Sequence, residues 1–207
     1  MNILITGVGG QGLVTLKKVL SYATIKEGSF FRASELHGLS QRGGSVSVHF
    51  RFSPSTSSGQ DPSNSLRTGQ INSPLILQNE ADLIIGLDLL EATRAINFAS
   101  SKTVFLVNNH FIPFFQLPTF TKEDFLKIVQ PITKNIFIVE AAKICQEKLK
   151  SNVFEGIFLL GFGAEKKVIL FNKDSLVFGI KKVIPSKFTK ANIKAFDLGK
   201  KYGQQYL

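Results

Sequence analysis

The segment "NILITGVGGQGLVTLKKVL", residues 2–20, carries the clearest information on the fold. Its first part, residues 2–6, is a short apolar run rich in β-branched side chains, which predicts a buried strand. The run stops at "GVGGQG", Gly7 to Gly12, and apolar residues then recur at helical spacing as far as Gly28, a typical C-cap. A strand, a glycine loop and a helix in this order indicate an α/β fold of the Rossmann-like kind.

The rest of the chain alternates strands with helices. Strands are expected at residues 29–34, 45–52 and 83–86, at 102–109, and at the start of 134–149. Helices are expected from near Asp88, in the second part of 134–149, and at 152–164, where apolar residues on nearly every face indicate a buried helix. This alternation predicts a three-layer α/β domain with a mainly parallel sheet.

Residues 53–72, "SPSTSSGQDPSNSLRTGQIN", interrupt this pattern. They are rich in serine, proline and glycine and contain hardly an apolar side chain, so burial cannot offset the entropy lost on ordering them. We therefore expect an exposed, mobile insertion within a single domain that spans residues 1–207.

The composition is that of a globular protein, with 43% hydrophobic and 19% charged residues. No apolar run reaches the roughly 18 residues that span a bilayer. The N-terminus lacks the basic segment of a signal peptide, so a cytoplasmic location is expected. Cys145 is the only cysteine, which excludes an intrachain disulfide and a four-thiolate iron–sulfur cluster held by this chain alone. It is predicted to be a buried, inert thiol, and no residue spacing predicts a metal site.

The formal net charge of +10 is concentrated in the second half of the chain. Residues 1–100 hold 8 basic and 7 acidic side chains, whereas residues 101–207 hold 17 lysines and 8 acidic side chains. A basic half can mark a nucleic-acid surface. These lysines are scattered through amphipathic patterns without an arginine run or an RNA-binding aromatic motif, so a solvated lysine face is favoured over nucleic-acid binding.

The glycine loop fits the G-x-G-x-x-G pattern at Gly7, Gly9 and Gly12. Backbone N–H groups at the start of the following helix can face a phosphate there. A dinucleotide site also needs an acidic residue near the end of the second strand, and Glu35 is the only candidate. However, Gly10 is an extra glycine, and Gln11 places an amide where a plain helix start would suffice. The alternative is that the glycines only make a tight junction.

The second candidate segment is "SELHGLSQRGGSV", residues 34–46. His37 can move a proton near neutral pH, Gln41 can donate and accept hydrogen bonds, and Arg42 offers a planar fork that suits a carboxylate or phosphate. The pair Gly43-Gly44 lets the backbone pass close to a bound group or to a partner chain. The alternative is that these residues cap helices and seal a subunit interface. His49 and His110 stand alone, and lone histidines are typically structural.

Five segments together resemble the gamma-type subunit of 2-oxoacid:ferredoxin oxidoreductases, closest to the beta subunit of indolepyruvate ferredoxin oxidoreductase. They are "GVGGQG", "SELHGLSQRGGSV", "SPLI", "GLDLLEATRA" and "NIKAFDLGKKY". The second is similar to that branch's S-E-x-H-G-x-x-Q-R-G-G-S-V almost residue for residue. The chain departs from the family where Asp88-Leu89 replaces Glu-Pro, where Phe114 replaces the second proline of Ile-Pro-Pro, and where Gly156 replaces the usual asparagine.

The resemblance implies an enzyme shared with a large partner subunit. Such enzymes oxidatively decarboxylate a 2-oxo acid with thiamine diphosphate, pass electrons through iron–sulfur clusters to ferredoxin and release an acyl-CoA; the branch favours aryl pyruvates. This chain has one cysteine and no G-D-G thiamine signature, so the partner must supply both cofactors.

The resemblance also suggests site residues. Candidates for the shared active site are Glu35, His37, Gln41 and Arg42; candidates for cofactor binding are Gly7, Gly9, Gly10, Gln11, Gly12, Gly43 and Gly44. The rival hypothesis is a free-standing NAD(P)-binding protein of Rossmann type, which predicts cofactor binding by the isolated chain.

Overall fold

The computed structural model describes residues 1–38, 43–53, 71–114 and 116–206. The candidates Gln41 and Arg42, and residues 54–70 of the expected insertion, lie outside the described residues.

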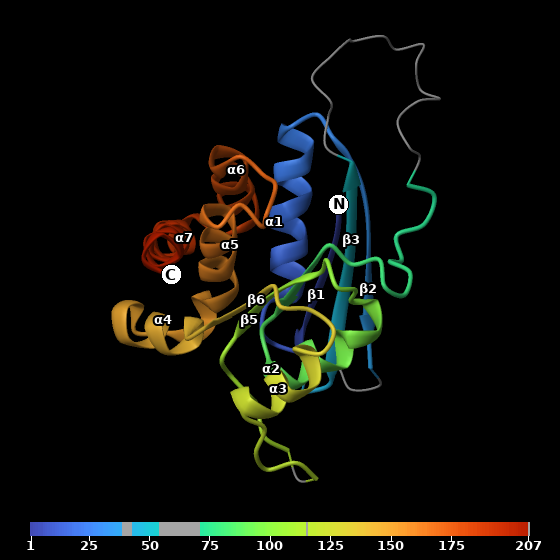
Figure 1. Cartoon of the computed structure of the whole chain (residues 1–207). Coiled ribbons are helices and arrows are strands. Elements are labelled where there is room, and N and C mark those ends of the chain that lie inside the picture. Colours follow the sequence, from blue (N-terminus) through green and yellow to red (C-terminus); the bar gives the residue numbers. More distant parts are fainter. Residues whose placement is uncertain (39–42, 54–70, 115, 207) are drawn as a thin grey trace.

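A six-stranded sheet forms the centre of the molecule (Figure 1). The strands are β1 (Asn2–Val8), β2 (Phe30–His37), β3 (Ser45–Ser53), β4 (Leu83–Gly86), β5 (Val104–Asn108) and β6 (Ile136–Val139). Their order across the sheet is β2-β3-β1-β4-β5-β6. Strands β1, β4, β5 and β6 pair in parallel, whereas β3 is antiparallel to both of its neighbours. The predicted α/β class with a mainly parallel sheet is confirmed, with one antiparallel strand added.

The length of one connection explains the antiparallel strand. Only residues 38–44 join β2 to β3, and a parallel neighbour would require a crossover of a dozen or more residues. The two strands therefore pair as a hairpin, and β3 takes the position next to β1 that the second strand of a Rossmann fold usually holds.

Helices cover both faces of the sheet (Figure 1). They are α1 (Leu13–Lys26), α2 (Leu89–Arg94), α3 (Lys122–Val129), α4 (Ala141–Leu149), α5 (Glu155–Glu165), α6 (Lys173–Val183) and α7 (Ser186–Gln205), with 3₁₀ turns at Ala95–Phe98 and Asn152–Phe154. Ile3 and Ile5 pack into a core with α1, α5, α6 and α7, while Leu4 faces the opposite core with α2 and α3. The three-layer arrangement is thus confirmed.

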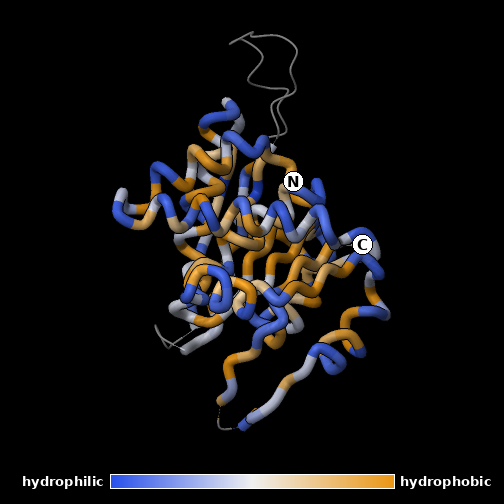
Figure 2. The backbone as a smooth tube through the Cα atoms, turned by 90° about the vertical axis from the view of Figure 1, so that its left-hand side faces the viewer, coloured by the Kyte–Doolittle hydropathy of each residue, from blue (hydrophilic) through white to orange (hydrophobic). Residues whose placement is uncertain are grey.

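Helix α5 is buried along almost its whole length, as the sequence predicts. Beside it lies α7, which holds many of the hydrophilic residues on the outer surface, while apolar stretches gather around the sheet (Figure 2). No helix in the described part of the chain is long and apolar enough to cross a membrane.

Candidate functional site

The two glycine-containing segments lie side by side at the carboxyl end of β1. The antiparallel register pairs Val8 with Ser45, so the start of β3 lies beside the end of β1. The Gly9 N–H donates to the Gly44 carbonyl over 2.8 Å, and the Gly43 N–H donates to the Gly9 carbonyl over 3.4 Å. A parallel β3 would have placed Gly44 at the opposite edge of the sheet, so the hairpin is what joins the two segments.

The glycine loop is shaped around the side chain of Gln11. Gly10 and Gly12 have φ angles of 109° and 84°, in the left-handed region that favours glycine. The Gln11 side chain folds back so that its Oε1 accepts the Val8 N–H over 2.7 Å. A Cβ atom at Gly7 would lie 2.8 Å from the same oxygen. The absence of a side chain at Gly7 therefore leaves room for the Gln11 side chain, which explains part of the glycine pattern.

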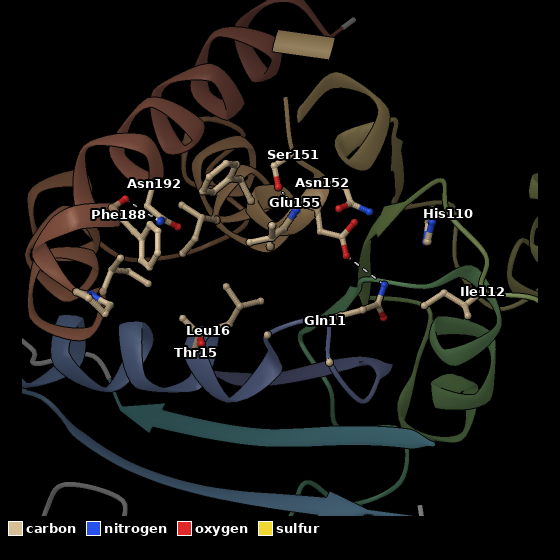
Figure 3. Close-up of a pocket in the computed structure, with 18 residues that line it drawn as sticks. Gln11, Thr15, Leu16, His110, Ile112, Ser151, Asn152, Glu155, Phe188 and Asn192 are labelled. Carbon is tan, nitrogen blue, oxygen red and sulfur yellow. Dashed lines mark hydrogen bonds between the residues drawn. The ribbon is translucent and has the colours of Figure 1, made fainter. Parts of the chain in front are cut away.

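Glu155, the first residue of α5, joins this loop to two neighbouring strands (Figure 3). Gln11 Nε2 donates to Glu155 Oε1 over 3.1 Å and to the Leu87 carbonyl over 3.1 Å. From the end of β5, Asn108 Nδ2 donates to Glu155 Oε2 over 3.0 Å and to the same Leu87 carbonyl over 3.3 Å. Asn108 Oδ1 in turn accepts the Ala142 N–H at the start of α4 over 3.1 Å. One carboxyl group thus connects the glycine loop with the ends of β4 and β5.

The environment of Glu155 opposes its negative charge. Only 5% of the residue is exposed, and this burial raises its pKa to about 7. The hydrogen bonds from Gln11 and Asn108 act in the opposite direction, and the charge of Asp88 raises the pKa further. Glu155 therefore changes its charge close to neutral pH. Cys145 on α4 is buried and its pKa is raised to about 12, by burial and then by Glu155, as expected for an inert thiol.

Two further carboxylates fix the loops around the site. Asp88 Oδ1 accepts two N–H groups in the first turn of α2, and its Oδ2 accepts the Ile112 N–H over 2.8 Å. Glu91 accepts a 2.5 Å hydrogen bond from Ser45 Oγ and pairs with Arg94 over 2.6 Å. Glu91 thereby holds the start of β3, and its place in the first turn of α2 also complements the helix dipole.

A cleft of about 580 Å³ opens beside the glycine loop, between α1, α5 and the junction of α6 with α7 (Figure 3). Its polar lining includes Gln11, Thr15, His110, Ser151, Glu155 and Asn192. Its apolar lining includes Leu16, Ile112, Phe154, Ile157, Ile184 and Phe188. In the described part of the chain no lysine or arginine lines this cleft. Among the described residues, a phosphate in this cleft would therefore be bound by backbone N–H groups and not by a cationic side chain.

The predicted site residues occupy different positions around this cleft. Gly10, Gln11 and Gly12 line it, whereas Gly7, Gly9, Gly43 and Gly44 support the loops behind it. Glu35 and His37 lie near the end of β2, at the same sheet edge but two strands away from β1.

The surroundings of Glu35 do not fit a ribose-binding acid. It pairs with Lys17 on α1 and, over 3.2 Å, with His37; the hydrogen bond from Lys17 is the main reason that the pKa of Glu35 is lowered. Because β3 separates β2 from the glycine loop, Glu35 does not occupy the position expected for dinucleotide binding.

Sequence reasoning missed Glu155 and Asn108. One signal was available: Glu155 is the only acidic residue in the apolar segment 152–164 that is predicted to be a buried helix. The two lone histidines differ. His49 is buried and accepts the Ile76 N–H over 3.0 Å at Nδ1, in line with a structural role. His110 lines the cleft, and its buried Nδ1 has no hydrogen-bond partner in the part of the chain that the structure describes.

The fold and the cleft define an α/β domain with a Rossmann-like glycine loop. The β2–β3 hairpin lies beside this loop, at the carboxyl end of β1. Residues 2–202 match the pyruvate ferredoxin/flavodoxin oxidoreductase family, and the chain belongs to that family. Proteins of this family act as subunits of ferredoxin-dependent oxoacid oxidoreductases, so the resemblance found in the sequence is confirmed and a free-standing NAD(P)-binding protein is not favoured.

Individual relatives agree with this assignment. The chain is 29% identical to indolepyruvate oxidoreductase subunit IorB of Pyrococcus horikoshii and of Thermococcus kodakarensis, over 100% of this chain and 97% of each relative. Its fold is similar to that of a keto/oxoacid ferredoxin oxidoreductase gamma subunit from Geobacter sulfurreducens, with a TM-score of 0.66, 18% identity and coverage of 99% of this chain and 98% of that one. A pyruvate oxidoreductase subunit, PORC of Thermotoga maritima, gives a TM-score of 0.67 at 19% identity, with coverage of 97% and 95%.

Proposed function

We propose that this chain is the small subunit of a 2-oxoacid:ferredoxin oxidoreductase that acts on aryl pyruvates. The enzyme would convert the 2-oxo acid and CoA into an acyl-CoA and CO₂ and transfer two electrons to ferredoxin. The observation that carries the proposal is the full-length similarity to indolepyruvate oxidoreductase subunits.

We propose that the cofactors of this reaction are bound by a larger partner subunit. Thiamine diphosphate would supply the decarboxylation chemistry, and clusters ligated by cysteine would carry the electrons. The residues of this chain do not fit a cluster, because its single cysteine is buried in α4. In the described ranges no group of three His, Cys, Asp or Glu residues could hold a metal ion.

The carboxyl-end edge of the sheet is the part of this chain that we assign to the shared active site. The glycine loop, the pair Gly43-Gly44 and the Glu35–His37 pair all lie along it. Arg42 directly precedes Gly43 in the sequence, and a guanidinium at this place suits the carboxylate of the oxo acid or a phosphate of CoA.

Reconstitution tests this proposal. The chain is assayed alone and with its proposed large thiamine and iron–sulfur subunit, using thiamine diphosphate, CoA and a viologen dye as electron acceptor. Dye reduction is expected only from the complex, and faster with indolepyruvate or phenylpyruvate than with pyruvate. Omitting CoA is the control for acyl transfer. Dye reduction by the chain alone, or a preference of the complex for pyruvate, would contradict the proposal. Tight NAD(P) binding by the isolated chain would support the rival function.

A further inference from the structure

Helix α7 carries a stripe of lysines on its outer face. Lys187, Lys190 and Lys194 recur at spacings of three and four residues, so they lie on one line along the helix. All three are exposed, whereas the buried residues Phe196 and Gly203 lie on the opposite side of α7. We call these three lysines the lysine stripe.

The charge of the lysine stripe is not balanced within the described part of the chain. Residues 175–196 contain five lysines and no acidic side chain. None of the three stripe lysines forms an ion pair with another described residue. The acidic residue of α7, Asp197, pairs with Lys200 over 3.3 Å. The stripe is therefore a surface of one sign that faces solvent.

The lysine stripe does not stabilise the helix that carries it. Lys187 lies in the first turn of α7, where the positive end of the helix dipole disfavours a cation, and this turn contains no acidic residue. Lysines three or four positions apart on one face also repel each other. Lys181 and Lys182 differ, because they lie in the last turn of α6, where a cation is favoured. Helix stability thus accounts for the lysines of α6 but not for the stripe.

The lysine stripe borders the cleft. Nζ of Lys187 lies 4.8 Å from the centroid of the Phe188 ring, and Phe188 lines the cleft and is 50% exposed. The glycine loop forms another wall of the same cleft (Figure 3). A partner that covers the cleft and reaches the edge assigned to the shared active site therefore meets an apolar ring flanked by lysines.

We propose that the lysine stripe is a docking surface for an acidic face of the large partner subunit. This inference rests on the proposed function, and its basis is charge complementarity, because a surface of one sign attracts and orients a partner of the opposite sign. A second copy of this chain does not fit, since two basic surfaces repel each other. Nucleic acid fits less well, because residues 101–207 contain no arginine, the side chain that best matches a phosphate.

Association rates with the large subunit test the proposal. The stripe is removed in Lys187→Gln/Lys190→Gln/Lys194→Gln. A control with the same change of charge, at exposed positions outside α6 and α7, is Lys102→Gln/Lys122→Gln/Lys134→Gln. Stopped-flow mixing of each full-length protein with the large subunit measures the association rate constant. At about 20 mM salt the stripe variant should associate at least about fivefold more slowly than the wild type, and this difference should shrink to less than about twofold at about 0.5 M salt. The control should stay within about twofold of the wild type at both concentrations.

The melting temperature shows whether the stripe variant folds. It should equal or exceed that of the wild type, because the substitutions remove repulsion along α7. A lower melting temperature would mean that the stripe serves the stability of the helix, and it would count against the proposal.

Other results would overturn the proposal. Equal slowing of the stripe variant and the control would show that only the net charge matters, and an unchanged rate for the stripe variant would show that the partner docks elsewhere. An affinity of the wild type for duplex DNA that the stripe variant loses, with the association rate unchanged, would assign the stripe to nucleic acid. Absence of any complex at both salt concentrations would contradict the proposed function itself, so the two failures are distinguishable.

Discussion

Glu155 is the residue whose ionisation opposes folding most directly, because it is buried in the folded chain. Its pKa is about 7 in the folded chain, against about 4.3 for a hydrated glutamate. A carboxyl group whose pKa is raised on folding contributes stability that is fully present at low pH and is lost as the pH rises through the folded value. The relevant window here lies between about pH 4.5 and pH 7.5.

Glu155→Gln should therefore flatten the pH dependence of stability. From pH 5 to pH 8 the unfolding free energy of the wild type should lose on the order of 3 kcal/mol through this one group, since each unit of pKa shift corresponds to about 1.4 kcal/mol. Denaturant titrations of both proteins at the two pH values measure the difference. Glu147→Gln is the matched control, and a difference between wild type and Glu155→Gln that is the same at both pH values would contradict the prediction.

Arg42→Lys tests the proposed contact with an anionic ligand. The substitution keeps the charge but removes the planar two-pronged contact. A charge-assisted hydrogen bond contributes about 1.5–3 kcal/mol, so kcat/KM of the reconstituted complex should fall roughly 10- to 150-fold while assembly is retained. Titration with the large subunit separates the two roles suggested by the sequence. Full recovery of activity at saturating partner would identify Arg42 as an interface residue.

The crossing of helices α5 and α7 depends on two glycines. A Cβ atom at Gly161 would lie 2.0 Å from the Phe196 carbonyl oxygen, and one at Gly199 would lie 2.0 Å from the Phe158 carbonyl oxygen. Each helix therefore approaches the other through backbone atoms, which cannot move aside as a side chain can. This close contact lets α7 pack against the buried helix that carries Glu155.

Gly199→Ala should separate these helices and destabilise the fold. The clash with backbone should outweigh the gain of about 1 kcal/mol in helix propensity and leave a net loss of at least about 2 kcal/mol. A melting temperature lower by roughly 4–8 °C is expected for a chain of this size. Gly156→Ala is the comparison, because its nearest neighbours are side-chain carbons of Leu16, which can rotate, so its loss should be smaller. An unchanged melting temperature for Gly199→Ala would show that the helices tolerate a wider separation.

On the scale of the whole molecule, we propose that residues 1–207 form one cooperative domain and that the insertion contributes little to it. The composition of residues 54–70 supplies few apolar side chains for a core. Replacing them with a short Gly-Ser linker should leave a single thermal transition and change the melting temperature by less than about 5 °C. A larger decrease, or a second transition, would mean that the segment packs on the domain.

Local patterns in the sequence predict the elements of the fold that depend on short stretches of chain. Apolar runs and helical spacing correctly predicted β1, α1, β4, β5, β6 and the buried α5. Each of these elements could be predicted because the spacing of apolar residues within one segment indicates which of its faces are buried. The five segments that resemble the family, the glycine loop and "SELHGLSQRGGSV" among them, also indicated it correctly.

How these elements meet depends on the packing of segments that lie far apart in the sequence. The hairpin of β2 and β3 moves Glu35 away from the glycine loop and brings Gly44 to Gly9, a result of strand order that no local pattern encodes. The contact of Gln11 with Glu155 joins residues 144 positions apart, and that of Asn108 with Glu155 joins residues 47 apart. The pKa of Glu155 likewise depends on burial and on neighbours from several elements. These are properties of the packed molecule, because they arise only when distant segments exclude water together.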